Sequence, residues 1–382
     1  MTLRTTPLQF GYFLALSLAV LLWLRGRREE RLSDTMLGWI MFLLAQEIQD
    51  YTFGFAGINF LWDQLNGFPR GIALLFGPAV YFYLKSQVNR QFKFTRKHLI
   101  HLIPWAFFFI IGLSIFVQGK YAVQAFQESV WHDYQGNLHL VVMFISYIYY
   151  YYKSIKLYQA YRKWAVSQFS DIEIISFTWF RNLVYFMIAG LVFKLTMNVI
   201  DYIYDLPFYQ DWWWNLGTVV VIFYVGIWGY SQPQPNQINF ETSGDETLTE
   251  KFEPKSFEVI KSTSFDDDER LKAKIKKTME EHRAYLDANL TLSELAKRLK
   301  TNSSALSSVI NQHLGKNFND FVNEYRVEAF KENVAKVDNQ NYTLLAVALD
   351  CGFNSKATFN RAFKKFTGIS PREYVNKKPS NC

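Results

Sequence analysis

Cysteine is almost absent from this chain of 382 residues, which contains only Cys351 and Cys382. Two cysteines argue against a disulfide framework and against a zinc site built from thiolates. Catalytic motifs are missing as well, because neither HExxH nor GxSG occurs in the sequence. We therefore expect a protein that is not an enzyme and that holds neither a metal ion nor a cofactor.

Polar sequence is scarce before Tyr230 and abundant after it. Most of the 11 Trp, 23 Tyr and 35 Phe precede this residue, although the mean hydropathy of the whole chain, −0.05, resembles that of a soluble protein. This division excludes a single soluble globule and excludes a disordered chain. The net charge of +7 suits contact with anionic partners without identifying any of them.

Seven apolar segments before residue 231 approach the roughly 20 residues that a membrane-spanning helix needs. The third and fifth are short or rich in aromatic residues, so six or eight spans remain alternatives. The first precedes Arg25, Arg27 and Arg28 and lacks a small-residue cleavage site, which favours a retained helix over a signal peptide. The segments are 8–24, 36–57, 71–86, 99–117, 138–152, 179–200 and 213–230.

Basic residues concentrate in alternate loops between these segments. Loops one, three and five hold twelve Lys and Arg residues, whereas the N-terminus and the other loops hold three. The positive-inside bias therefore predicts an N-terminus outside the membrane and a C-terminus in the cytoplasm. An odd number of spans requires the same arrangement.

Polar side chains inside the second and sixth segments need an explanation, because an unpaired charge in hydrocarbon is costly. Asp50 and Lys194 each lie roughly 20 Å beyond the start of their helix at 1.5 Å per residue, so they can meet at one depth. Two interpretations remain open: an ion pair that joins two helices, or a pocket open to the outside that binds a small molecule or an ion. The candidate sensor residues are Glu47, Asp50, Lys194 and Asn198.

The sequence predicts three domains. Residues 1–231 form the membrane domain, and the polar residues 232–267 form a flexible cytoplasmic linker. Residues 268–380 form a helical domain, which opens with a helix from Asp268 to Leu286.

An internal near-repeat occupies most of this last domain. Its copies begin at Thr291 and Thr343, and each predicts a short helix, a tight turn and a second helix. Thr291 and Glu294 have the spacing of a capping box. Gly352 suits the second turn because glycine accepts a positive φ. Residues 318–334 predict one long helix between the copies.

Two helix-turn-helix units on one connecting helix resemble the DNA-binding domain of the AraC/XylS family. The strongest match is residues 350–374, with Gly-Phe at the turn, aromatic residues inside the second helix, Phe-Lys-Lys, Gly-x-Ser-Pro and a terminal Tyr. The resemblance covers residues 268–374. It departs from the family at Lys300, which occupies the position of Gly352, and in the serine-rich second helix of the first unit. The whole chain also resembles membrane-embedded regulators of this family.

The resemblance implies that the second helix of each unit lies in the major groove of double-stranded DNA. Arg361 is the main candidate for reading guanine, with a phosphate contact as its alternative. The second unit further offers Lys356 and Asn360 to the bases and Lys364, Lys365 and Arg372 to phosphates. The first unit offers Ser304, Ser307, Ser308 and Asn311, and its small serine side chains predict weak or permissive base reading.

The sequence thus predicts an all-α protein with a seven-helix transmembrane bundle and a cytoplasmic double helix-turn-helix domain. We expect a sequence-specific transcription regulator, tethered to the bacterial cytoplasmic (inner) membrane, that couples a signal at the membrane or outer face to transcription. Its expected partners are DNA, the lipid bilayer, a small-molecule or ion ligand and, by family analogy, a second copy of itself. The alternatives are a membrane transporter or enzyme with a regulatory tail, and a membrane receptor whose helical domain docks a protein partner.

Overall fold

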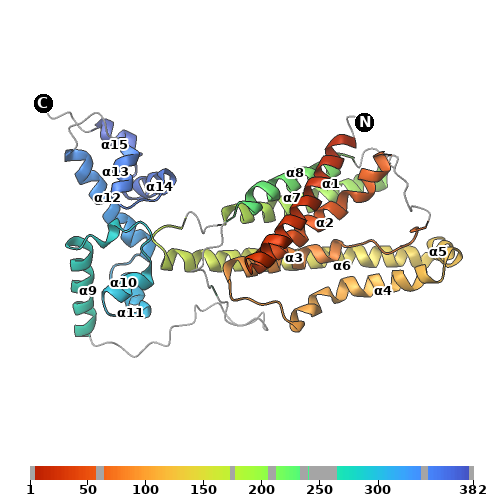
Figure 1. The fold of residues 1–382 in the computed structure, drawn as a ribbon, viewed down its shortest axis with the longest axis horizontal. Coiled ribbons are helices and arrows are strands. Elements are labelled where there is room, and N and C mark those ends of the chain that lie inside the picture. The colour runs from red at the N-terminus through yellow and green to blue at the C-terminus, as the bar shows by residue number, and fades with distance from the viewer. Residues whose placement is uncertain are drawn as a thin grey trace. The chain divides into compact units, whose positions relative to one another are not determined.

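The structure, a computed structural model, describes residues 5–56, 64–172, 177–204, 212–232, 240, 265–336 and 343–377. The regular elements in these ranges are helices, as Figure 1 shows. The chain divides into two compact units. We call residues 1–159 with 177–241 the apolar unit, and residues 160–176 with 242–382 the C-terminal unit. Most of the predicted linker, 232–267, lies outside the described residues.

Each of the seven predicted apolar segments is largely helical in the apolar unit. The helices extend beyond several of the segments, and α6 continues to Gln168, well past the end of the predicted segment 138–152. A short helix, α5, has no counterpart in the sequence analysis. The elements are α1 (Thr5–Arg28), α2 (Leu32–Ala56), α3 (Ala73–Val88), the 3-10 helix η1 (Arg96–Leu102), α4 (Ile103–Val117), α5 (Lys120–Gln127), α6 (Val130–Gln168), α7 (Thr178–Tyr204), α8 (Trp212–Tyr224) and the π-turn η3 (Val225–Gly229).

Three helical stretches of the described chain are long and apolar enough to cross a membrane. They are Thr6–Arg28, Arg96–Val117 and Thr178–Met197, and the apolar stretch Asn215–Gly229 is shorter. Among the other helices, α3 has only 16 residues and α2 carries Glu47 and Asp50. The seven helices are therefore present, whereas seven membrane crossings stay a prediction.

An ion pair joins three helices of the apolar unit at one end. The Arg25 guanidinium donates from Nε and Nη2 to the two oxygens of Asp34, at 2.7 and 2.9 Å. Its Nη1 donates to the carbonyl of Tyr230, at 2.9 Å. Charge-assisted bidentate pairs of this kind are strong and directional. Arg25 thereby fixes the end of α1 to the start of α2 and to the chain leaving η3.

The C-terminal unit contains the two predicted helix-turn-helix units. The first is α10 (Leu292–Arg298) with α11 (Ser303–Ser308), which continues as the π-turn η5 (Val309–His313). The second is α13 (Leu344–Asp350) with α14 (Lys356–Thr367). The long helix α12 (Phe318–Lys336) connects them, and the remaining elements are α9 (Phe265–Glu280), η4 (Ala284–Leu286) and α15 (Pro371–Lys377).

The predicted helix from Asp268 to Leu286 is shorter in the structure. The helix α9 ends at Glu280, and Arg283 adopts a left-handed backbone with a φ of 47°. A left-handed residue cannot continue a right-handed helix, so residues 284–286 form the separate turn η4.

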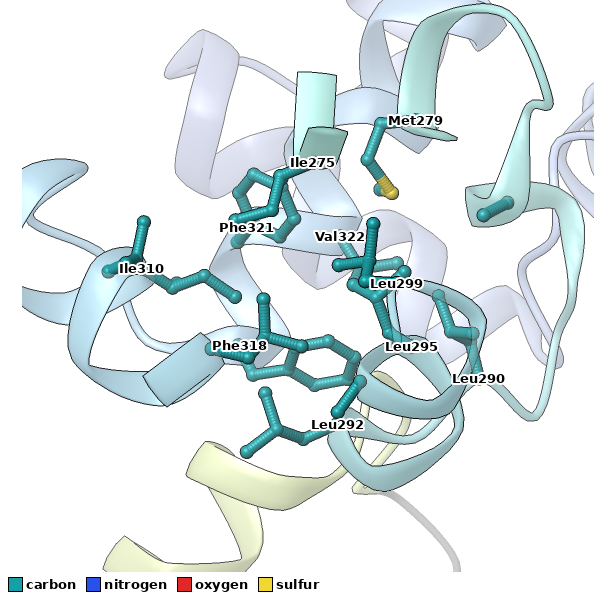
Figure 2. Packing of buried hydrophobic residues seen from close by; sticks show 14 residues of the cluster. Ile275, Met279, Leu290, Leu292, Leu295, Leu299, Ile310, Phe318, Phe321 and Val322 are labelled. Carbon is teal, nitrogen blue, oxygen red and sulfur yellow. The ribbon is translucent and has the colours of Figure 1, made fainter. Parts of the chain in front are cut away.

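The helix α12 contributes to the cores of both helix-turn-helix units. Its first half supplies Phe318, Phe321 and Val322 to the first core, which Figure 2 shows with Leu295 of α10 and Met279 of α9. Its second half supplies Val327 and Phe330 to the second core. Phe330 lies with its ring centroid 4.5 Å from that of Phe359 of α14. One helix therefore holds the two helix-turn-helix units together, because it supplies apolar residues to both cores.

Polar caps and a close glycine determine where the short helices begin and turn. The predicted capping box is confirmed, because the hydroxyl of Thr291 accepts from the amide of Glu294 at 3.2 Å and the Glu294 carboxylate accepts from the amide of Thr291 at 2.9 Å. Gly352 has a φ of 91°, and an added Cβ would overlap the carbonyl oxygen of Tyr285. Lys300, at the equivalent position, also adopts a positive φ of 54°. The second turn therefore requires glycine for its backbone and for its packing.

Alanine at Gly352 should destabilise the second unit more than alanine at Gly315 destabilises the first. Both residues have a positive φ, which costs a residue with a Cβ about 1–2 kcal/mol. An added Cβ at Gly315 meets nothing within 4 Å, whereas one at Gly352 clashes with backbone and should cost about 1–3 kcal/mol more. Hydrogen–deuterium exchange of the full-length variants would measure both effects. Equal losses of protection would contradict the packing argument.

Candidate nucleic-acid interface

The helix α14 presents a polar face because aromatic residues anchor its opposite face. Ser355 caps its start, where the hydroxyl accepts from the amide of Thr358 at 3.1 Å. Gly368 ends it with a left-handed φ of 79°. Phe359 and Phe363 are buried in the second core. Since successive residues are rotated by about 100° around a helix, the other side of α14 faces outward.

The outward face of α14 is strongly basic. The helix contains four basic residues and no acidic one. The side chains predicted to meet DNA in this unit are all exposed: Lys356, Asn360, Arg361, Lys364, Lys365 and Arg372. Lys365 donates from Nζ to a carboxylate oxygen of Asp320 on α12, at 2.6 Å, so this lysine is engaged in an ion pair within the unit. The arrangement provides a positively charged surface that suits a polyanion.

The first unit offers a different surface. Asn302 caps α11 by accepting from the amide of Ala305 at 2.7 Å, and the helix turns into η5 after six residues. Ser308 and Asn311 are exposed, while Ser304 and Ser307 are half-buried. Asn311 donates to the hydroxyl of Ser307 at 3.1 Å. The segment 303–313 contains no Lys, Arg, Asp or Glu, so α11 and η5 provide little electrostatic attraction of their own.

A buried cation lies between the two helix-turn-helix units of the C-terminal unit, and the sequence analysis did not identify it. Arg326 of α12 is 0% exposed. Its Nε donates to the carbonyl of Tyr285 and its Nη2 to the carbonyl of Asp287, both at 2.8 Å. Burial lowers the pKa of Arg326 to about 10, against the opposing effect of Asp171 and Asp287, so the guanidinium stays protonated at neutral pH. The sequence feature that could have identified this buried cation is a basic residue placed directly before Val327 on the apolar face of α12.

The candidate sensor residues lie on α2 and α7 of the apolar unit. Glu47 and Asp50 are exposed, and Asp50 accepts from Nη1 of Arg70 at 3.2 Å. The side chains of Lys194 and Asn198 lie outside the described part of the structure. Pairing of Asp50 with Lys194 therefore stays a prediction.

A cavity of about 280 Å³ lies elsewhere in the apolar unit. Phe108 of α4, Val123 and Phe126 of α5, and His132 and His139 of α6 line it. Mostly apolar walls with a few polar groups are typical of small-molecule sites. Within the described residues, no group of three or more His, Cys, Asp or Glu side chains could hold a metal ion.

Comparison with known proteins gives matches to the C-terminal unit. Residues 295–377 match the family model described as a helix-turn-helix domain. An uncharacterized HTH-type transcriptional regulator of Staphylococcus aureus (strain COL) is 36% identical over 92 residues, which are 24% of this chain and 12% of that protein. The uncharacterized HTH-type transcriptional regulator YtdP of Bacillus subtilis (strain 168) is 33% identical over 94 residues, which are 25% of this chain and 12% of that protein.

These relatives share only a small part of their length with this chain, and no solved structure matches it. The matched family segment contains all of the second unit and the connecting helix α12. The geometry and the family match agree on the same elements. Residues 295–377 of this chain therefore resemble a helix-turn-helix domain both in sequence and in the arrangement of their helices.

Proposed function

We propose that this protein is a transcription regulator of the AraC/XylS type that binds specific sites on double-stranded DNA. The observation that carries the proposal is the capped, basic and outward-facing helix α14 within a segment that matches a helix-turn-helix domain. The similar proteins of S. aureus and B. subtilis are named as HTH-type transcriptional regulators, which supports the same function here. The second unit supplies most of the affinity because its recognition helix carries the charge.

The proposal includes attachment to the bacterial cytoplasmic (inner) membrane through the apolar unit. Large apolar side chains on several of its helices face away from the protein, among them Phe10 at 60%, Ile110 at 63%, Ile148 at 65% and Val199 at 59% exposure. Exposed apolar surface of this kind is unfavourable in water and favourable in lipid. The charge of the loops supports seven spans with the N-terminus outside and the DNA-binding unit in the cytoplasm.

The apolar unit also offers places for a signal to bind. A small molecule or an ion could occupy the polar residues of α2 and α7 or the cavity lined by α4, α5 and α6. Regulation then requires that the ligand bind one state of the protein more tightly than another. We include a second copy of the chain as a partner, in a homodimer on DNA.

Replacing Arg361 by alanine should abolish the discrete peaks that genome-wide occupancy mapping finds for the full-length protein. On a DNA fragment from such a peak, the affinity should fall by about 1–3 kcal/mol, and the base preference should relax at one position. Lys364→Ala should instead weaken binding to all sequences alike and reduce the slope of log affinity against log salt by about one. Lys331→Ala, on α12, is the control and should bind like the original protein. Unchanged binding by the Arg361 variant would remove this residue from the interface.

Labelling of single cysteines tests the membrane topology. In a variant with Cys351 and Cys382 replaced by alanine, Lys120→Cys should react with a membrane-impermeant maleimide in intact spheroplasts. Lys163→Cys should react only after lysis, because its loop is predicted to be cytoplasmic. The reverse pattern would overturn the orientation, and recovery of the full chain in the soluble fraction would overturn the membrane attachment.

A further inference from the structure

A short segment that follows the end of α6 is part of the C-terminal unit. Residues 160–176 group with this unit rather than with the rest of α6. Ser170 is 1% exposed and Ile172 is 8% exposed. In Figure 2, the pale yellow-green ribbon close to Leu292 and Phe318 is this end of α6. The segment 169–172, which we call the docking segment, is thus buried against the helix-turn-helix domain.

The docking segment first contacts the start of the first unit. The amide of Ser170 donates to the carbonyl of Leu290 at 3.2 Å. Phe169 and Thr291 form an isolated antiparallel β-bridge. Leu290 and Thr291 immediately precede α10. Backbone contacts of this kind position the segment independently of its side chains.

Three side chains of α12 then hold Ser170. Asn319 donates from Nδ2 to the carbonyl of Ser170 at 2.7 Å, and Asn323 donates to the same oxygen at 3.3 Å. Arg326 donates from Nη2 to the hydroxyl of Ser170 at 3.2 Å. Asn319, Asn323 and Arg326 are spaced at helical intervals, so they form one polar stripe on α12. The docking segment therefore supplies acceptors to a buried cation and to two amides.

Asp171 extends the contact to the recognition helix of the second unit. Its Oδ1 accepts from the hydroxyl of Thr358 at 3.2 Å. Thr358 is 2% exposed and lies in the first turn of α14. A carboxylate is stabilised beside the start of a helix by the helix dipole. Three consecutive residues, Phe169, Ser170 and Asp171, thus touch the residues that precede α10, the first half of α12 and the start of α14.

The same region contains direct contacts between the turn of the second helix-turn-helix unit and the loop that precedes the first. Asn354, in the turn of the second unit, donates from Nδ2 to the carbonyl of Ala288 at 2.9 Å. Gly352, in the same turn, packs against the backbone of η4. Arg326 donates to the carbonyls of Tyr285 and Asp287 beside this contact. The docking segment completes this interface by covering Arg326. The predicted DNA-facing residues of α14 stay exposed while the segment is bound.

From these contacts we propose that the surface formed by Asn319, Asn323, Arg326 and Thr358 is a binding site for the chain's own docking segment, and that the docked state is the one competent to bind DNA. The docked segment fixes the spacing of the two recognition helices. Because α6 begins in the apolar unit at Val130, a change in that unit reaches the DNA-binding unit through α6. The linker 232–267, which leads into α9, is another covalent connection between the two compact units. The inference rests on the proposed function, since its readout is DNA binding.

The first experiment displaces the docking segment from its site in the full-length protein, which is kept in detergent. Ser170→Trp is too large for a site that is 1% exposed, and Lys163→Trp places the same side chain on an exposed position of α6 as the control. Hydrogen–deuterium exchange should rise at 288–291 and at the start of α14 in the Ser170 variant alone. Its affinity for the target DNA should fall by about tenfold, within the range of typical coupling between sites. An unchanged or increased affinity, with the exchange raised, would overturn the proposal.

The second experiment enforces docking and does not depend on a disruptive substitution. In a background with Cys351→Ala and Cys382→Ala, Phe169→Cys with Thr291→Cys places two thiols on opposed positions of the β-bridge, where Cβ atoms lie about 4.5–5.5 Å apart. The oxidised protein should bind DNA as tightly as the reduced one. A loss of binding on oxidation would show that the docked segment inhibits, and would overturn the proposal. If the original protein binds no DNA while the exchange data still show docking, the proposed function fails and not the docking site.

Discussion

The guanidinium of Arg326 carries a charge where water is excluded, and much of the C-terminal unit is arranged to supply it with acceptors. Removing a charged group from water costs several kcal/mol unless hydrogen bonds replace its hydration. The carbonyls of Tyr285 and Asp287 and the hydroxyl of Ser170 provide those bonds. None of these three acceptors lies in an α-helix. The requirement of one side chain therefore brings together α12, the chain before α10 and the docking segment.

This arrangement explains how two small helix-turn-helix units keep a defined relation to each other. Neither unit buries a large core alone, and both depend on the apolar residues of α12. Packing on a shared helix determines their distance along α12. The polar contacts of Arg326 and Asn354 determine the rotation, because hydrogen bonds are directional while apolar contacts are not. A DNA-binding domain that reads two neighbouring grooves needs both a defined distance and a defined rotation between its helix-turn-helix units.

The two proposed recognition helices differ in charge. Positive charge is concentrated on α14, whereas α11 is short, uncharged and continues into a π-turn. Phosphate contacts supply affinity and base contacts supply specificity. We therefore expect the second unit to anchor the protein and the first to adjust to the sequence it meets. Regulation through the docking segment would change the position of α11 relative to an α14 that is already bound.

Local patterns were enough to predict the helices, the two repeats and the basic face of α14. The Thr291 capping box, the glycine at 352 and the alternation of Phe359 and Phe363 with basic residues depend on neighbours within a few positions, so the sequence itself determines them. The short helix α5, the extension of α6 to Gln168 and the π-turn after Ser308 were not predicted, because α5 has only eight residues and no pattern of apolar residues marks the length of α6 or the π geometry. The contacts of Lys365 with Asp320 and of Asp171 with Thr358 join residues 45 and 187 positions apart. Only the tertiary structure could decide such contacts, because the partner of a polar side chain depends on which distant segment the packed core brings beside it.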